Sequence, residues 1–215
     1  ILIMVAALLA LTMAPAVADG TVDVDMSRIP LVFIENQGQK SAEVLYHADA
    51  AGHSIYFTRD GVVCVAGATE NEPGSAVTIT MVGQEAGALV VGEDLLPGTA
   101  NFFLGSDPGK WVSSVPTYGS VRYTGVLPGV DVIYYGTQGA LKRDIRLAAG
   151  VDPATVVFRY SGQESLSIDE EGALLVETAT GMLVEAAPFC YQVIDGTQVP
   201  ISCEYVILGD SLVGF

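Results

Sequence analysis

The chain has 215 residues, of which 25 are acidic and nine basic, giving a formal net charge of −16. Nucleic-acid binding needs several cations converging on phosphates, so this charge balance argues against a nucleic-acid partner and against an anionic membrane surface. Half of the residues are hydrophobic, only 16% are charged and 24 are glycines. This composition excludes a disordered chain and is typical of a sheet protein with tight turns.

Residues 1–18 have the features of a secretory signal peptide. They are apolar apart from Thr12 and end in Ala16-Val17-Ala18 before Asp19, which is the pattern of a hydrophobic region followed by a cleavage site. An uncleaved anchor is the alternative, since eighteen apolar residues lie at the lower limit for spanning a bilayer. Pro15 and the small residues at the end favour cleavage. We therefore predict export, with a mature module at 19–215 that contacts the membrane only through the signal peptide or a distal anchor.

Short strand-like runs recur along the mature chain. Residues 54–58 and 62–65 flank Asp60-Gly61, which is a hairpin signal. Residues 76–82 alternate, with Val77, Ile79 and Met81 expected on the inner face. Further strands are predicted at 141–147, 155–160, 166–168, 173–176, 190–194 and 199–208.

No segment has a sustained helical period, so only short helical turns are expected, near 41–44 and at 152–154. The fold class predicted is all-β, an antiparallel β-sandwich or two packed β-sheets with little helix. The polar residues 70–75 indicate a loop, and a weaker boundary signal lies near Gly150, where a second β unit would begin.

Two Leu-Pro-Gly tripeptides, at 96–98 and 127–129, are each predicted to form a tight reversal, because Pro presets φ and Gly supplies positive φ. Between them, 120–124 reads as a half-buried strand with Val121 and Tyr123 on one face. After the second tripeptide, the residues of 130–135 alternate in the same way.

The stretch 96–136 also carries a family resemblance. Its fixed positions are Leu96-Pro97-Gly98, Asn101-Phe102-Phe103, Gly105, Asp107-Pro108, Trp111, Val115-Pro116, Tyr118, Val121-Arg122-Tyr123, Pro128-Gly129-Val130-Asp131 and Tyr134-Tyr135-Gly136, with flanking matches at 33–39 and 150–153. This pattern resembles the N-terminal domain of large prokaryotic cell-surface proteins that continue into SBBP-type, β-propeller-like repeats, and it covers about residues 29–215.

The resemblance implies a cell-surface location and a downstream repeat domain of the same chain as partner, with 215 residues being a fragment. It implies no activity, because the role of that family is not established. The sequence departs from it at 141–144, which is more basic than expected and leaves the facing of that strand open.

Three cysteines, Cys64, Cys190 and Cys203, leave at least one thiol free. Cys190 and Cys203 flank a predicted hairpin. A four-residue loop at 195–198 would set them opposite each other, whereas a two-residue turn at Asp195-Gly196 would pair Pro188 with Cys203. The sequence therefore leaves a disulfide between them undecided.

Several residue groups could suggest chemistry, and for each the structural interpretation is favoured. Gly209-Asp210-Ser211-Leu212 spells the motif of a hydrolase family, but only three residues follow it and both histidines lie far upstream. His47, His53 and Asp49 fit no common zinc spacing.

For four further groups the structural interpretation is also favoured. Asp19, Asp23 and Asp25, and the run 169–171, lack the spacing of a calcium loop. Residues 35–39 read as a turn whose side chains bond the backbone. The aromatic residues could form a carbohydrate platform, although core packing is favoured: Phe102, Phe103, Trp111, Tyr118, Tyr123, Tyr134 and Tyr135.

We therefore predict no catalytic, cofactor or metal site. The function expected is that of a non-catalytic, exported structural or interaction module that caps or presents a downstream repeat array. A carbohydrate-binding or adhesion module that contacts surface glycans or proteins is the alternative, and an esterase at Ser211 is a third hypothesis.

Overall fold

The computed structural model describes residues 2–10, 31–50, 53–67, 74–137 and 140–215, and nearly all of its regular elements are strands. The strands are β1 (Leu2–Ala10), β2 (Phe33–Glu35), β3 (Val44–Ala50), β4 (His53–Thr58), β5 (Gly61–Ala66), β6 (Ser75–Met81), β7 (Leu89–Phe102), β8 (Val112–Leu127), β9 (Val130–Thr137), β10 (Ala140–Leu147), β11 (Phe158–Ser161), β12 (Ser165–Ile168), β13 (Leu174–Thr178), β14 (Gly181–Glu185), β15 (Phe189–Ile194), β16 (Thr197–Ile201), β17 (Val206–Gly209) and β18 (Leu212–Gly214). Two short 3₁₀ turns, Pro108–Lys110 and Pro153–Thr155, complete the elements. The prediction of an all-β fold with little helix is confirmed.

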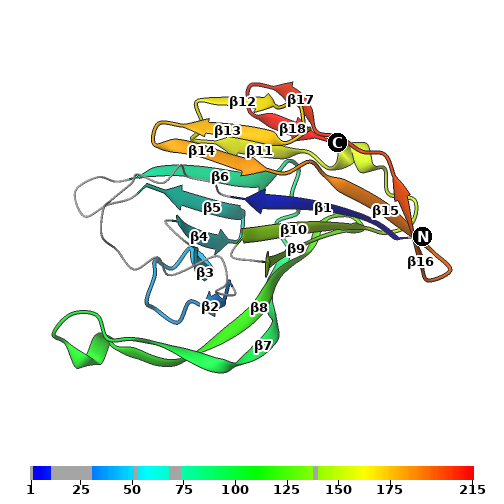
Figure 1. Cartoon of the computed structure of the whole chain (residues 1–215). Helices are drawn as coiled ribbons and strands as arrows, with labels where there is room; N and C mark the ends of the chain where they lie inside the picture. Colours follow the sequence, from blue (N-terminus) through cyan, green and yellow to red (C-terminus); the bar gives the residue numbers. More distant parts are fainter. Residues whose placement is uncertain (1, 11–30, 51–52, 68–73, 138–139) are drawn as a thin grey trace, which may run out of the picture.

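Antiparallel ladders join these strands into one long strip. Its order is β12–β13–β14–β1–β10–β9–β8–β2–β3–β4–β5–β6–β11–β18–β17, with β7 added to β8 and the β15–β16 hairpin added to β1. The strip curls back on itself, so that two layers face each other although they belong to one continuous ladder (Figure 1).

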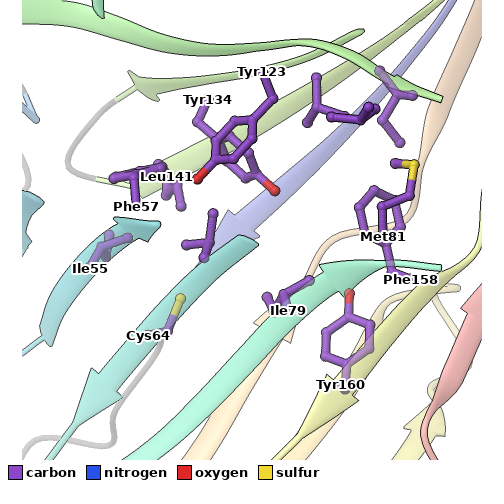
Figure 2. Close-up of a cluster of buried hydrophobic side chains, with 14 of the residues drawn as sticks. Ile55, Phe57, Cys64, Ile79, Met81, Tyr123, Tyr134, Leu141, Phe158 and Tyr160 are labelled. Carbon is purple, nitrogen blue, oxygen red and sulfur yellow. The ribbon is translucent and has the colours of Figure 1, made fainter. Parts of the chain in front are cut away.

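The core lies between β4–β6 with β11 on one side and β8–β10 on the other (Figure 2). The ring of Tyr134 lies 5.5 Å from that of Phe57 and 5.7 Å from that of Tyr123, both edge-to-face. The Tyr123 hydroxyl is within hydrogen-bond distance of the carbonyl oxygens of Thr58 and Gly61, at 2.8 and 3.0 Å. A buried hydroxyl is therefore satisfied across the two layers, which fixes their relative position.

Several local predictions are confirmed. Val77, Ile79 and Met81 are buried on β6, and β4 and β5 form the predicted hairpin. The 3₁₀ turn at Pro153–Thr155 falls where a helical turn was expected, and its cap is the carboxylate of Asp152, which accepts from the Ala154 N–H at 2.9 Å.

The two Leu-Pro-Gly tripeptides differ in structure. At 127–129 the chain reverses between β8 and β9, with Gly129 at φ 74°, as predicted. At 96–98 the prediction of a reversal is wrong, because these residues form a bulge inside β7. Leu95 pairs with Tyr118 and Thr99 pairs with Pro116, so the three residues 96–98 of β7 lie opposite the single residue Thr117 of β8. The Thr117 hydroxyl donates to the Gly98 carbonyl at 2.7 Å.

The C-terminal hairpin has the two-residue turn. Asp195 and Gly196 have φ of 51° and 79°, and Cys190 pairs with Ile201. Cys203 lies just past the end of β16 and still bonds to Cys190, with a Cα–Cα distance of 6.0 Å. The predicted strand at 199–208 is wrong in one respect, since residues 202–205 interrupt it and divide it into β16 and β17. The strand expected at 155–160 begins only at Phe158.

Other predictions fall partly outside the described residues. Most of the loop expected at 70–75 lies outside the described residues. The end of the predicted signal peptide also lies outside them, whereas its first part, Leu2–Ala10, forms β1 within the sheet. The pairing of β6 with β11 joins segments on either side of Gly150. Within the described residues, no helix is long and apolar enough to cross a membrane.

A pair of glycine substitutions tests the close packing of this strip. Gly150 and Gly162 both have positive φ, of 86° and 94°, but a Cβ at 150 would meet nothing within 4 Å, whereas one at 162 would overlap the Ala76 carbonyl oxygen of β6. Gly150→Ala should cost about 1–2 kcal/mol from backbone strain alone. Gly162→Ala should cost about 1–3 kcal/mol more from the overlap. Urea unfolding of both variants measures the difference, and equal costs would contradict this packing.

Candidate functional site

The β7–β8 hairpin forms an arm that reaches away from the curled strip, with the Pro108–Lys110 turn at its end (Figure 1). Residues 117 and 118 of β8 still pair with β2, but nearer the tip β8 pairs only with β7. A two-stranded ribbon has little stability of its own in water. The end of the arm therefore depends on local contacts or on a partner for its order.

Local contacts organise the tip. Asp107 accepts from the Gly109 N–H at 3.0 Å, Asn101 accepts from the Ser114 N–H at 2.8 Å, and the Trp111 indole donates to the Gly105 carbonyl at 3.2 Å. These bonds hold the backbone while the apolar side chains Phe103, Leu104 and Trp111 remain 62, 67 and 43% exposed. The rings of Phe103 and Trp111 lie 5.4 Å apart, edge-to-face. We call Phe103, Leu104 and Trp111 the tip patch.

Near its tip, the arm also packs against His47 of β3. The Phe102 ring lies 5.8 Å from the His47 imidazole, which is 1% exposed. Neither ring nitrogen of His47 has a hydrogen-bond partner, and the nearest carboxylate oxygen, of the exposed Asp49, is 4.0 Å away. Burial lowers the pKa of His47, and the charge of Lys40 lowers this pKa further. His47 is therefore neutral at pH 7.

A second polar group is fully buried in the body. Arg143 donates to Glu185 at 2.7 Å, and the hydroxyls of Tyr160 and Tyr205 donate to the same carboxylate at 2.6 and 3.3 Å. The guanidinium carbon also lies 4.0 Å from the ring centre of Phe158. We call Arg143, Glu185, Tyr160 and Tyr205 the buried charge cluster. Three groups thus bond to one carboxylate away from solvent, while the Nε of Arg143 has no hydrogen-bond partner. The cluster links β10, β11 and β14 in the interior.

The free thiol of Cys64 lies near this cluster. Burial raises the pKa of Cys64 to about 12, with the charge of Glu185 adding to the shift. The thiol is therefore protonated at neutral pH and is a poor nucleophile.

The structure places the sequence-predicted candidates as follows. Ser211 lies in the turn between β17 and β18, where its carbonyl accepts from the Tyr160 N–H at 2.8 Å. Asp169 accepts from the backbone N–H groups of Glu171 and Ala173, at 3.0 and 2.8 Å, as a turn residue does. Among the described residues, no group of three or more His, Cys, Asp or Glu side chains could hold a metal ion. Asp19, Asp23 and Asp25 lie outside that part of the chain.

Residues 35–39 form the predicted turn. Asn36 accepts from the N–H groups of Gly38 and Lys40, at 3.1 and 3.0 Å, and donates to the Ser41 and Val44 carbonyls, at 2.8 and 2.7 Å. One amide side chain thus replaces a set of backbone bonds, and the interpretation as a backbone-bonding turn is confirmed.

The aromatic candidates do not share one surface. Tyr123 and Tyr134 are buried, Phe102, Tyr118 and Tyr135 are partly buried, and only Phe103 and Trp111 are exposed. Sequence reasoning missed the buried charge cluster, because the partners of Arg143 lie 17 to 62 positions further along the chain. The one available signal was the arginine at an inward position of an apolar strand.

The unpaired His47 gives a testable pH dependence. The ordinary pKa of histidine, about 6.5, applies to His47 in the unfolded chain, whereas its pKa in the folded chain is lower. Below about pH 6.5 the unfolded chain therefore binds more protons than the folded chain, so the free energy of unfolding should fall as the pH drops. His47→Phe should reduce this fall and be at least as stable at pH 7.5, because no unpaired polar atoms are left buried. Urea unfolding between pH 7.5 and 5.5 measures both. Asp49→Asn is the control and should keep the pH dependence of the free energy of unfolding. The same pH dependence in wild type and in His47→Phe would contradict the role assigned to His47.

The buried charge cluster gives a second prediction. Glu185→Gln leaves the Arg143 charge buried without its counter-ion and should cost about 3–5 kcal/mol of stability. The double variant Arg143→Met with Glu185→Leu removes both charges and should recover most of that loss. Denaturant titration of the single and double variants provides the measurement, and a double variant as unstable as the single one would argue against the ion pair.

The family described as a domain of unknown function, DUF7948, matches residues 33–215. No curated protein and no solved structure matches the chain. The matched stretch contains β2 to β18, including the arm and the buried charge cluster, and so covers most of the sequence. The chain therefore belongs to the DUF7948 family of domains of unknown function.

Proposed function

We propose that this chain is a non-catalytic interaction module of an exported cell-surface protein, which uses the β7–β8 arm to hold the first unit of a downstream β-propeller-like repeat array. The export signal and the resemblance to SBBP-repeat proteins support the setting, and the tip patch supports the mode of contact.

The tip patch is the observation that carries this proposal. Three large apolar side chains stand exposed at the end of an ordered ribbon, with Leu95 (69% exposed) further along the same arm. Exposed apolar groups that are clustered and rimmed by polar residues are typical of protein interaction sites. Aromatic side chains, tryptophan above all, are also the residues that most often dominate the binding energy of an interface.

The edge of the arm favours contact through side chains. Among the described strands, β7 pairs with β8 on one edge only, and the bulge at Pro97 interrupts the strand. The carboxylates of Glu93 and Asp94 are bonded to Arg122 and Ser120 of β8, at 3.3 and 3.0 Å. Proline and bulges protect a strand edge from pairing with other strands. Binding at the arm is therefore expected at the tip patch, where the apolar area lies.

The first test measures binding of the chain to its downstream repeats produced as a separate polypeptide. Trp111→Ala and Phe103→Ala should each weaken binding at least tenfold, since hot-spot truncations cost about 2 kcal/mol or more. Both variants should keep the wild-type Tm, because the two rings contact each other at the tip and lie outside the buried core.

Phe189→Ala is the matched control. Phe189 is 55% exposed and lies on β15, outside the arm, so its loss should leave binding unchanged. Equal weakening by all three substitutions, or by none, would count against binding through the tip patch.

Carbohydrate binding is the second candidate, and exposure of the Trp111 ring favours it, since sugars stack on such faces. The edge-to-face arrangement of Phe103 and Trp111 offers one stacking face rather than a flat pair. A glycan array probed with wild type and Trp111→Ala separates the two functions. Glycan binding lost in Trp111→Ala would replace the repeat-holding proposal, and absence of glycan binding would remove this candidate.

A further inference from the structure

One interior position of the strip is filled by β1 (Figure 1, blue). On one edge β1 pairs antiparallel with β10, from Ile3 opposite Leu147 to Leu9 opposite Leu141. On the other edge it pairs with β15 over residues 2–6 and then with β14 at residues 9 and 10. β1 is therefore hydrogen-bonded on both sides, and among the described strands no backbone ladder joins β10 directly to β14 or β15.

This strand lies within residues 1–18, which the sequence predicts to be removed on export. A chain beginning at Asp19 keeps β10, β14 and β15 but lacks the strand between them. Adjacent strands are about 4.8 Å apart, so β10 and β14–β15 would lie about 10 Å from each other, which leaves room for one strand between them. Backbone N–H and C=O groups along both of its edges would lose their partners, which is costly in the interior of a sheet.

The vacated position would also uncover apolar residues. Leu141, Ile145 and Leu147 of β10 are at most 3% exposed with β1 in place, and Cys190 of β15 is 2% exposed. In the ladder these residues are opposite positions 3, 5 and 9 of β1. An occupant of this position must therefore be apolar on at least that face.

The buried charge cluster spans the same position. Arg143 belongs to β10 and Glu185 to β14, the strands on either side of β1, and their charged groups meet at 2.7 Å. The β1 residue opposite Arg143 is Ala7. Directly opposed residues of an antiparallel pair share one face of a sheet. The ion pair thus holds the two edges one strand apart and leaves space only for a small residue at that register position.

We propose that the position between β10 and β14–β15 is a strand-acceptor site, which in the exported chain binds an extended apolar strand of another polypeptide in place of residues 2–10. The ligand is a segment of about seven to nine residues that runs antiparallel to β10, with a small residue opposite Arg143. Strand addition of this kind draws affinity from main-chain hydrogen bonds and specificity from alternate side chains. The inference rests on the predicted cleavage and is independent of the tip patch.

The test uses the full chain, produced without export so that residues 1–18 are retained, with a protease site introduced between Ala18 and Asp19. After cleavage, the released residues 1–18 are removed by denaturation and gel filtration, and the remaining chain is refolded. A fluorescent peptide with the sequence of residues 2–10 and a lysine tail is then added, and its binding is followed by anisotropy. The expected result is saturable uptake that is competed by the unlabelled peptide.

Two altered peptides serve as controls. A peptide with Val5→Pro lacks an amide N–H of the central ladder, and one with Ala7→Trp places a large residue opposite Arg143; each should bind at least tenfold more weakly. A cleaved chain that stays folded and takes up no peptide overturns the proposal, as does equal uptake of all three peptides. If the cleaved chain unfolds, the unaltered peptide must restore the near-ultraviolet circular dichroism on refolding, and failure to do so also overturns it.

A cysteine cross-link in the uncut chain tests the register directly. Leu8→Cys with Lys142→Cys joins opposed residues and should form a disulfide under mild oxidation. Leu8→Cys with Arg146→Cys is displaced by four residues along β10 and should not. A cross-link in the second pair as readily as in the first would contradict the strand position on which the acceptor site depends.

Discussion

The fold depends on one buried carboxylate. Glu185 of β14 accepts from Arg143 of β10, from Tyr160 of β11 and from Tyr205 in the segment before β17, so three other parts of the chain donate to its two oxygen atoms. Removing the charges of Arg143 and Glu185 from water is costly, and only close geometry with additional hydrogen bonds offsets that cost. The two tyrosine hydroxyls supply those bonds. An apolar core of the same volume could be as stable, so the cluster's distinct contribution is to fix which strands lie together.

That constraint explains how a single ladder becomes two layers. A long antiparallel strip with free ends would twist without closing. Here the contact of β10 with β14 and β11, together with the Tyr123 hydroxyl at the Thr58 and Gly61 carbonyls, ties the strip at two points far apart in sequence. The edge-to-face rings of Phe57 and Tyr134 fill the space between the ties. A few polar contacts within a large apolar interface therefore hold the two layers of the strip against each other.

Local patterns predicted most of the strands, and two features that they did not predict depend on contacts between distant parts of the chain. Alternation on β6, the hairpin of β4 and β5 and the Asn36 turn all depend on neighbours within a few residues, and all are confirmed. The tripeptide at 96–98 reads like the one at 127–129, yet it becomes a bulge, because the long strand β8 continues past it and keeps β7 paired. The pairing of Arg143 with Glu185 spans 42 positions. Contacts over such a separation form only when the strip of strands folds back on itself, and a pattern of neighbouring residues does not predict that step.

The arm and the core are parts of one strand, and this links a contact at the tip to the stability of the body. β8 has sixteen residues, about 50 Å of chain at the rise of a strand, and runs from the tip patch to the buried Val121 and Tyr123. The next strands along the ladder are β9 and β10, which carries Arg143. A load applied at the tip therefore passes along paired backbone into the part of the sheet that the buried charge cluster holds together. Under the proposed function, this continuity would transmit a force from a bound partner into the apolar core.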